Sequence, residues 1–565
     1  MREQARLFKH MLRILRTTFL SAMLLGICSA GAYAQDVPVE PLPEGYTPNE
    51  RPQSLSLDIY RQNVHQELSH FLRTSEDARH LKRGKISSLD VNAFDEVPDS
   101  LFFTNRQGKK KMSGEELKQG VKTATSAGPA PGPWTVIKGK NTGMNRGMFI
   151  EDSKGVKFLL KFDPEDNIEI ASSAESVSSR IFHAIGYNVP EYYVTTFSRD
   201  QLSPAPNAHY YAQSGFNKPL TQEGIDEILA RLPQTSNGSY RASASKLLEG
   251  HVLGRDEFDA RRKKDPNDPV WHRDRRTFRT LRIFGSWVNY YDLIPQNSLE
   301  LTIDVDGKRV IKHYIIDFGS TLGSAGYETK PDVFGFEYLF DFGEIFKSLV
   351  TLGFYNKPWQ RRADQLTDAP PASVGNFDNR EFNPGKWKAQ LPANAFKDLT
   401  PADAFWASKL IKQFSDDDIR MLVEAGEYTD KEAVNYLTKI LSERRDIIAR
   451  YWFEKVSPLI DFEVNQQGSG LLIAFSDLSE TYGFVNSQDT SYRFEVFDVK
   501  PGGDKGKSVG SGASEESSFT LDASKGVSSG KNIVEIRAKH GSDNVWLPPV
   551  ILEMDQGQVT GVQHK

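Results

Sequence analysis

Cysteine is almost missing from this chain, because Cys28 is the only one among 565 residues. A single cysteine excludes a framework of internal disulfides and any metal cluster built on several thiolates. The chain also lacks an excess of positive charge: its formal net charge is −5, which removes the main electrostatic argument for nucleic-acid binding. With 38% hydrophobic and 11% aromatic residues the chain can bury real cores, so global disorder is excluded and about three domains are expected from its length.

Long apolar runs are scarce, and only the one near the N-terminus is uninterrupted. Five basic residues precede an apolar run from Thr17 to about Ala32. The run ends in Ala32-Tyr33-Ala34, the small-x-small pattern of a signal-peptidase site. We therefore predict a signal peptide over residues 1–34 and an exported protein, in a bacterial periplasm or outside the cell. A retained membrane anchor is the alternative.

A second apolar stretch, residues 334–354, is too charged to span a membrane. Glu337, Asp341, Glu344 and Lys347 interrupt it. We expect a buried, aromatic helical segment there.

Changes of pattern along the chain predict its domains. Residues 35–133 combine a leader rich in Pro, Glu and Gln, one amphipathic helix with apolar residues every four positions from Tyr60 to Leu72, and a polar loop. Residues 460–565 alternate with period two, which predicts a small all-β domain of the sandwich type. Within it, a stretch rich in Gly, Ser and Lys at 502–518 is expected to be a loop.

The middle of the chain, residues 134–457, begins with strands and ends with helices. Helical spacing, period-two alternation and turn residues predict its elements. In order these are strands at 134–138, 148–152 and 156–162, a helix at 170–185, a strand at 189–197, a helix at 278–288 and a hairpin of 299–303 and 310–316. Helices return after Pro401, and Thr429 with Glu432 is typical of a capping box before the last of them.

The sharpest chemical pattern is an aspartate and an asparagine five positions apart, followed by a hairpin and Asp-Phe-Gly. Asp292 and Asn297 share one short loop, and the hairpin after them returns into Asp317-Phe318-Gly319. Phosphoryl transfer needs a carboxylate near the attacking hydroxyl and oxygen ligands that hold Mg²⁺ on the nucleotide phosphates. The loop supplies a carboxylate and one ligand, and the aspartate after the hairpin supplies the second.

This order resembles the protein-kinase-like superfamily over about residues 134–455. The resemblance implies an α+β, two-lobed fold with an antiparallel β N-lobe and a mainly helical C-lobe. It also implies that Asp292 acts as the catalytic base or positions the hydroxyl. Asn297 and Asp317 would then hold Mg²⁺ or Mn²⁺.

Residues upstream follow the same order. Lys161, in an expected strand, resembles the lysine that grips the α- and β-phosphates of ATP. Glu175 in the next helix is placed to pair with this lysine, and Glu169 is the second candidate. Between the first two strands, three glycines spaced G-x-x-x-G-x-x-x-G stand where such folds have a phosphate-covering loop: Gly139, Gly143 and Gly147.

Several departures separate the chain from eukaryotic-type protein kinases. Tyr290-Tyr291 stand where typical kinases have His-Arg, and Ile294 replaces the lysine that commonly neutralises the transferred phosphate. A second Asp-Phe-Gly begins at Asp341, but no hairpin precedes it, so we assign it to structure. The pattern favours a divergent bacterial branch, such as the aminoglycoside phosphotransferases, lipid-kinase-like proteins or HipA-type toxin kinases.

A basic run from His272 to Arg276 has two interpretations. It is placed to meet a phosphate or an acidic substrate, or it flanks a helix and pairs with Asp265, Asp268 and Asp274. We favour the second.

The leading hypothesis is an exported phosphotransferase that moves the γ-phosphate of ATP to a hydroxyl acceptor on a protein, glycan, lipid or small molecule. The alternative is a catalytically inactive kinase-fold binding protein of the bacterial envelope, because the periplasm is not expected to hold much ATP. A third possibility is an envelope-associated structural protein whose C-terminal β-domain does the recognising.

Overall fold

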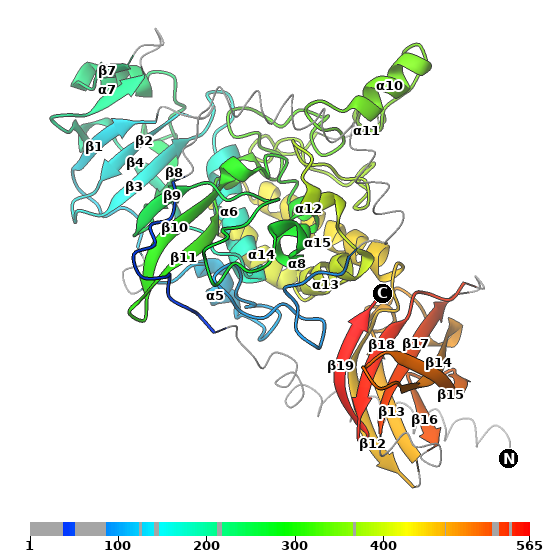
Figure 1. Cartoon of the computed structure of the whole chain (residues 1–565). Helices are drawn as coiled ribbons and strands as arrows, with labels where there is room; N and C mark the ends of the chain where they lie inside the picture. Colours follow the sequence, from blue (N-terminus) through cyan, green and yellow to red (C-terminus); the bar gives the residue numbers. More distant parts are fainter. Residues whose placement is uncertain are drawn as a thin grey trace. The chain divides into compact units, whose positions relative to one another are not determined.

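The structure is a computed structural model that describes residues 38–50, 86–123, 127–140, 146–211, 217–364, 369–468, 470–522, 530–541 and 545–565. The chain forms two compact units, shown in Figure 1. The larger unit comprises Val37–Val91 and Asp99–Val456, and the C-terminal unit comprises Ser457–Lys565 together with Asn92–Pro98. The expected signal peptide, the expected helix from Tyr60 to Leu72 and Gly143 lie outside the described residues.

The larger unit contains a six-stranded sheet in the order β4-β8-β3-β2-β1-β5. Strands β1, β2 and β3 are antiparallel neighbours, as predicted, and only β5 pairs in parallel, with β1. Apolar side chains that alternate along the strands, such as Phe158, Leu160 and Phe162, are buried in one core. The strands are β1 Trp134–Gly139, β2 Gly147–Glu151, β3 Lys157–Phe162, β4 Tyr192–Phe197, β5 Leu202–Pro204 and β8 Tyr240–Lys246.

Helix α6, Ile170–Ile185, lies between β3 and β4 of this sheet in the sequence and confirms the predicted range. Gly186 ends it with a φ of 145°, and its N–H donates to Phe182 O at 3.1 Å. The helix is buried almost along its whole length, and two of its serines donate to backbone carbonyls of a distant segment: Ser173 to Gly426 O and Ser176 to Ala425 O, at 2.7 and 2.6 Å. Small hydroxyl side chains thus let the helix pack closely without leaving buried polar groups unpaired.

The predicted hairpin is also confirmed. Strands β10 Ser298–Val305 and β11 Lys308–Ile315 pair antiparallel and join at Asp306-Gly307, whose φ values are 49° and 76°. Two positive φ values are what a two-residue type I′ turn requires. Strand β9, His251–Gly254, adds a third strand. The helix expected before the loop is two short ones, α8 Arg276–Arg279 and α9 Leu281–Trp287.

Helices α13 Pro401–Lys412, α14 Asp416–Glu424 and α15 Lys431–Phe453 complete the unit. The predicted capping box at Thr429 is wrong. Asp430 is the N-cap of α15 and accepts from Glu432 N at 2.9 Å, while the Thr429 N–H donates to Glu169. An aspartate one position later therefore takes the role, and aspartate caps at least as well as threonine.

The remaining elements of the larger unit are short. They are α5 Gly114–Gln119, β6 His209–Tyr211, β7 Asn217–Pro219, α7 Gln222–Leu229, α10 Phe342–Val350, α11 Pro358–Asp364 and α12 Asn394–Lys397.

The helical stretch expected over 334–354 is shorter, and it is not buried. Only Glu344 is buried within α10, whereas its apolar side chains face solvent. Residues 334–354 thus contain a helix, but the prediction from their aromatic composition that this helix is buried is wrong. Among the described residues no helix combines the length and apolarity that a bilayer crossing needs.

In its described part the C-terminal unit consists mainly of strands, with the short helix α16, Leu478–Thr481, and a 3-10 turn at Ser487–Asp489. A three-stranded sheet and a five-stranded sheet contribute side chains to a single apolar core that includes Ile473, Tyr492 and Val534. The first sheet is β12 Leu459–Gln467, β13 Gly470–Asp477 and β16 Ser518–Asp522, and the second is β14 Thr490–Val499, β15 Lys505–Ser514, β17 Lys531–His540, β18 Val550–Asp555 and β19 Gln558–His564.

Two features of this unit differ from expectation. The loop predicted at 502–518 is largely the edge strand β15, because its backbone pairs with β14 over most of its length despite the glycines. Asn92–Pro98, from the range assigned to the leader, lies against β19: Val562 N donates to Ala93 O at 2.8 Å.

Candidate functional site

Three charged side chains from distant parts of the larger unit meet at one point. The Lys161 Nζ on β3 lies 2.6 Å from Glu175 Oε1 on α6 and 2.8 Å from Asp317 Oδ1, which follows β11. The side chains of Lys161 and Glu175 are buried, while that of Asp317 is 34% exposed. The pairing expected from the sequence is therefore present, with Glu175 and not Glu169 as the partner.

The charges in this triad support one another. Burial alone would lower the pKa of Lys161, but the carboxylates of Asp317 and Glu175 raise it above its ordinary value. Burial would raise the pKa of Asp317, but the ammonium of Lys161 holds it below its ordinary value. Ser243 on β8 donates to the other oxygen of Glu175 and fixes that carboxylate. Lys161 and Asp317 are therefore both charged at neutral pH.

Aromatic side chains hold Asp317 in place. Its φ of 62° lies in the left-handed region, and its N–H donates to the hydroxyl of Tyr192 at 3.1 Å. The hydroxyl of Tyr290 donates to the carbonyls of Ile316 and Asp317 at 2.6 and 2.9 Å. Phe318 is buried against these rings. The Tyr290-Tyr291 pair that departs from His-Arg thus has a local role, because Tyr290 orients the metal-ligand candidate.

The loop from Asp292 to Asn297 is tied to the strand that leads to Asp317. The Asn297 side-chain amide donates to Asp292 O at 2.7 Å, and the Ile316 N–H donates to Asn297 O at 2.9 Å. Asn297 ends a 3-10 turn that begins at Pro295. These bonds fix both ends of the loop against the residue before Asp317.

Asp292 has the electrostatic character of a proton acceptor. Burial and the nearby charge of Asp317 raise the pKa of its carboxyl to about 7, against the weaker opposing effects of Asn297, Lys330 and Lys161. A carboxylate that titrates near neutral pH suits general base catalysis. Asp292 and Asp317 therefore share one site with unequal affinities for a proton.

Lys140 and Lys330 also belong to the site, and sequence reasoning missed both. The ammonium of Lys140, directly after β1, interacts electrostatically with Lys161, Asp317, Glu175 and Asp292, and burial lowers its pKa. Lys330 is buried and donates to Asn289 O at 2.6 Å and to Ser320 O at 3.2 Å. The position of Lys140 directly after Gly139 could have indicated that it belongs to the site, whereas no local sequence pattern around Lys330 indicates this.

Two of the three candidate glycines are described, and both are required by packing. A Cβ on Gly139 would lie 2.6 Å from the Cβ of Tyr210, and one on Gly147 would lie 2.3 Å from Leu160 O. Gly147 thus lets β2 approach the backbone of β3 next to Lys161, its cross-strand partner. These contacts explain the glycines as sheet residues that border the site.

The donor set fits a divalent cation. Asp317 keeps part of its carboxylate accessible, and the amide of Asn297 adds a neutral oxygen. After burial, the negative charge of Asp317 is the next cause that raises the pKa of Asp292, so the two carboxylates repel each other. Mg²⁺ and Mn²⁺ prefer such oxygen ligands, and either ion would relieve this repulsion.

The second Asp-Phe-Gly has a structural role. The Asp341 side chain caps α10 by accepting from Glu344 N at 3.1 Å, and it also pairs with Lys388. Both carboxylate oxygens are therefore engaged in holding the local backbone.

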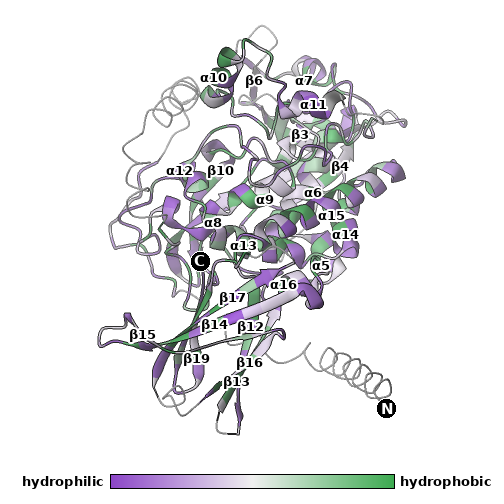
Figure 2. Ribbon diagram, turned by 90° about the vertical axis from the view of Figure 1, so that its right-hand side faces the viewer, coloured by the Kyte–Doolittle hydropathy of each residue, from purple (hydrophilic) through white to green (hydrophobic). Residues whose placement is uncertain are grey.

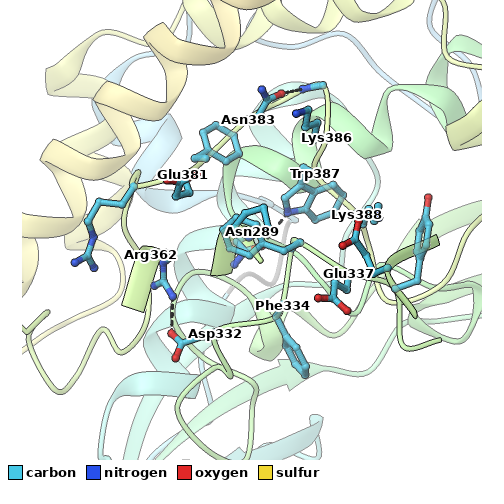
Figure 3. Close-up of a pocket in the computed structure, with 18 of the residues that line it drawn as sticks. Asn289, Asp332, Phe334, Glu337, Arg362, Glu381, Asn383, Lys386, Trp387 and Lys388 are labelled. Atoms are coloured by element: carbon cyan, nitrogen blue, oxygen red, sulfur yellow. Dashed lines mark hydrogen bonds and ion pairs between the residues drawn. The ribbon is translucent and has the colours of Figure 1, made fainter. Parts of the chain in front are cut away.

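A cavity of about 690 Å³ has Asn289, three residues before Asp292, in its lining. Figure 3 shows Asn289 and Trp387 in its wall, and Trp387 Nε1 donates to Asn289 Oδ1 at 2.9 Å. Tyr291, one residue before Asp292, stacks on Phe334 of the same wall with ring centroids 3.9 Å apart. The residue before Asp292 therefore contacts a side chain of the cavity wall directly.

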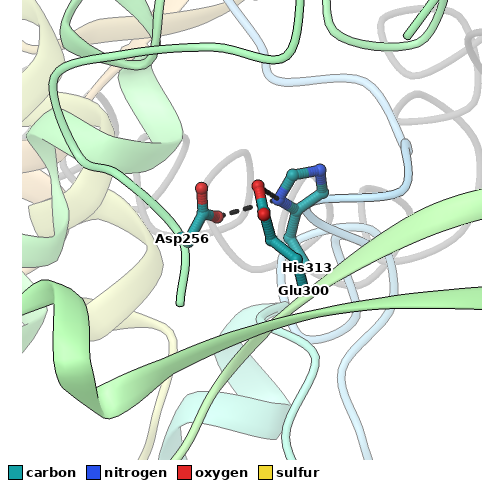
Figure 4. Close-up of side chains that lie close together, drawn as sticks. All are labelled: Asp256, Glu300 and His313. Carbon is teal, nitrogen blue, oxygen red and sulfur yellow. Dashed lines mark hydrogen bonds and ion pairs between the residues drawn. The ribbon is translucent and has the colours of Figure 1, made fainter. Parts of the chain in front are cut away.

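A separate buried cluster contains Asp256, Glu300 and His313, shown in Figure 4. His313 Nδ1 lies 2.8 Å from Asp256 Oδ2, and the guanidinium of Arg262 binds Glu300, with Nε at 2.7 Å. Burial would lower the pKa of His272, but the carboxylates of Asp256 and Asp268 raise it to about 10, and its Nδ1 lies 3.2 Å from Asp256 Oδ1. The carboxylates are thus neutralised by protein cations, so the cluster is an ion-pair network.

The basic run belongs to the same kind of network. His272 and Arg275 both pair with Asp268 at 3.0 Å, and Arg276 pairs with Asp403 at 3.0 Å. The interpretation as a helix flank with acidic partners is supported, although Asp403 comes from α13.

No protein-family model matches the chain, and no curated protein sequence matches it. Solved structures that are similar to it include two kinases. The Helicobacter pylori proinflammatory kinase CtkA matches at 12% identity over 56% of this chain and 99% of that chain, with a TM-score of 0.31. The Golgi casein kinase matches at 9% identity over 74% of this chain and 96% of that chain, with a TM-score of 0.24. Similarity at this level carries no argument, so the functional case rests on the geometry of the site.

Proposed function

We propose that the larger unit is a kinase-like phosphotransferase that moves the γ-phosphate of ATP to a hydroxyl acceptor. The observation that carries the proposal is the contact of Lys161 with both Glu175 and Asp317. A buried lysine held between two carboxylates, one of them accessible, matches what a nucleotide phosphate site needs: a fixed cation beside a metal ligand.

The nucleotide would be held from two sides. Lys161, oriented by Glu175, would contact the phosphates from β3, and Lys140 would add a second cation from the end of β1. Asn297 and Asp317 would hold Mg²⁺ or Mn²⁺. A divalent cation supplies charge neutralisation on the phosphates.

Asp292 would act on the acceptor. Its carboxylate would accept the proton of the acceptor hydroxyl as the oxygen attacks the γ-phosphorus. The bond from that phosphorus to the β-phosphate oxygen breaks, and ADP leaves. The pKa of about 7 supports this role, because a base near neutrality is ionised yet still attracts a proton.

Labelled nucleotide tests the proposal. Purified protein is incubated with γ-labelled ATP and Mg²⁺ or Mn²⁺, and phosphate transferred to protein or water is measured by mass spectrometry and ADP release. We expect Asp292→Ala to keep nucleotide binding and lose transfer, and Asp317→Ala to lose both. Asp341→Ala is the matched control, since that aspartate caps α10; in folded protein it should keep metal-dependent transfer.

The same experiment distinguishes an active phosphotransferase from the alternative, a catalytically inactive kinase-fold binding protein. Wild-type protein that binds nucleotide but transfers no phosphate under any metal condition would favour that alternative.

The basic, apolar and Ala-Tyr-Ala series at residues 1–34 supports the further proposal of export. N-terminal sequencing of exported protein should begin near Gln35, and an intact Met1 on a cytosolic form would reject export.

A further inference from the structure

Helix α10 buries a charged side chain and exposes most of its apolar ones. Its buried residue is Glu344, which lines the 690 Å³ cavity together with Lys347, and the two form an ion pair at 2.7 Å. Phe346 is 64% exposed and Leu349 67% exposed. Folding of the larger unit thus leaves the apolar face of this helix in water, where it contributes nothing to stability.

Figures 1 and 2 show the helix projecting from the body of the larger unit, with strongly hydrophobic residues along it. The apolar face continues past the helix into Leu352 and Phe354, and the latter is 90% exposed. We call six of these side chains the α10 patch: Ile345, Phe346, Leu349, Val350, Leu352 and Phe354.

The α10 patch is too large for an incidental surface feature. Taking roughly 200 Å² for a fully accessible large apolar side chain, the exposed fractions of its six members amount to about 800 Å². The largest apolar patch on a typical monomer is about 300–600 Å². A standard protein–protein interface buries about 800 Å² on each partner. The patch therefore has the area that one side of a stable dimer requires.

We propose that the α10 patch is the contact surface for a second copy of this chain. Two copies related by a two-fold axis would place the same helix against itself, so every apolar side chain meets an apolar partner without any second complementary surface. The contact would bury the one face that the isolated unit leaves exposed. This proposal does not depend on phosphotransfer.

The charges around the patch favour a protein partner over an anionic lipid surface. Lys347 pairs with Glu344, Lys357 with Glu337 at 2.8 Å, and Arg361 with Glu381 at 2.8 Å. Membrane-surface helices instead carry an excess of Lys and Arg that anionic headgroups attract. These cations are already neutralised by carboxylates of the same chain.

Sedimentation velocity over a concentration series tests the proposal with the full chain. Wild-type protein should sediment as a dimer that dissociates on dilution. Leu349→Glu should raise the dimer dissociation constant by at least about tenfold, because it places a charge at the centre of the contact in both copies. Val545→Glu is the matched control: Val545 is 68% exposed in the C-terminal unit and should leave the dimer unchanged. Phe354→Ser serves as a second variant, and both patch variants should keep the wild-type circular dichroism spectrum.

Three results would overturn the proposal. The first is wild-type protein that stays monomeric at every concentration. The second is a dimer that Leu349→Glu and Phe354→Ser weaken no more than Val545→Glu does. The third is monomeric protein that co-sediments with phosphatidylcholine or phosphatidylglycerol vesicles in a Leu349-dependent manner, which would assign the patch to lipid.

Discussion

Replacing Asp292 by asparagine should stabilise the metal-free protein, and the gain should grow with pH. The folded protein raises the pKa of this carboxyl from 3.8 to about 7, so it binds the proton more tightly than the unfolded chain does. The stabilising contribution of that proton is complete below about pH 4 and is lost as the pH rises through about 7. Wild-type protein at pH 8 therefore carries an ionised carboxylate near Asp317, whereas asparagine carries no charge.

The magnitude follows from the difference in pKa. Each unit corresponds to about 1.4 kcal/mol, so the full effect is about 4 kcal/mol, and about 3 kcal/mol of it falls between pH 5 and pH 8. These are upper bounds, because Asp292 is partly exposed and water screens its charge. A change of this size moves the unfolding midpoint of a large unit by several degrees.

Thermal unfolding in buffers containing EDTA measures the effect. The midpoint of Asp292→Asn minus that of wild type should increase from pH 5 to pH 8. Asp341→Asn is the control, and its effect on stability should have the opposite sign. Burial would raise the pKa of Asp341, but Lys388 lowers it below its ordinary value, so the ionised carboxylate stabilises the fold above about pH 4. That variant should be less stable than wild type throughout this range. A difference for Asp292→Asn that stays constant, or shrinks with pH, would refute the electrostatic account of the site.

Three further outcomes are expected. Lys140→Ala should weaken nucleotide binding by about tenfold, measured by calorimetry, because it removes a cation beside the metal ligands; unchanged affinity would place Lys140 outside the site. Gly147→Ala should lower the free energy of unfolding by about 1–3 kcal/mol, since its Cβ would lie 2.3 Å from Leu160 O, while Gly510→Ala, which has open space, should be near neutral in denaturant titrations. A fragment of residues 457–565 should give a β-type circular dichroism spectrum and unfold cooperatively, because its apolar core lies wholly within it; a helical or unfolded fragment would contradict this.

The sequence predicted well those features that depend on neighbouring residues. The hairpin at Asp306-Gly307 follows from the need for two positive φ values, and α6 follows from helical spacing that ends at Gly186. The pairing of Lys161 with Glu175 was also accessible, because a strand followed by a helix brings residues 14 positions apart together.

Prediction from the sequence failed where a feature depends on residues far away along the chain, or where two neighbouring residues can take the same structural role. Lys330 reaches the site through carbonyls of Asn289 and Ser320, and no local pattern encodes that approach. Composition predicts that apolar residues are buried, yet α10 turns Glu344 inward and leaves Phe346 in solvent. Strand β15 forms despite its glycines because β14 supplies a hydrogen-bonding partner.

We propose that Lys161, Asn297 and Asp317 form a metal-dependent nucleotide site. Titration calorimetry of the full chain with ATP, with and without Mg²⁺ or Mn²⁺, tests it most directly. We predict that wild-type protein binds ATP with the metal, that Asp317→Ala does not, and that Asp341→Ala binds as wild type does. Wild-type protein that binds no nucleotide with either metal, or equal losses in the two variants, would contradict the account.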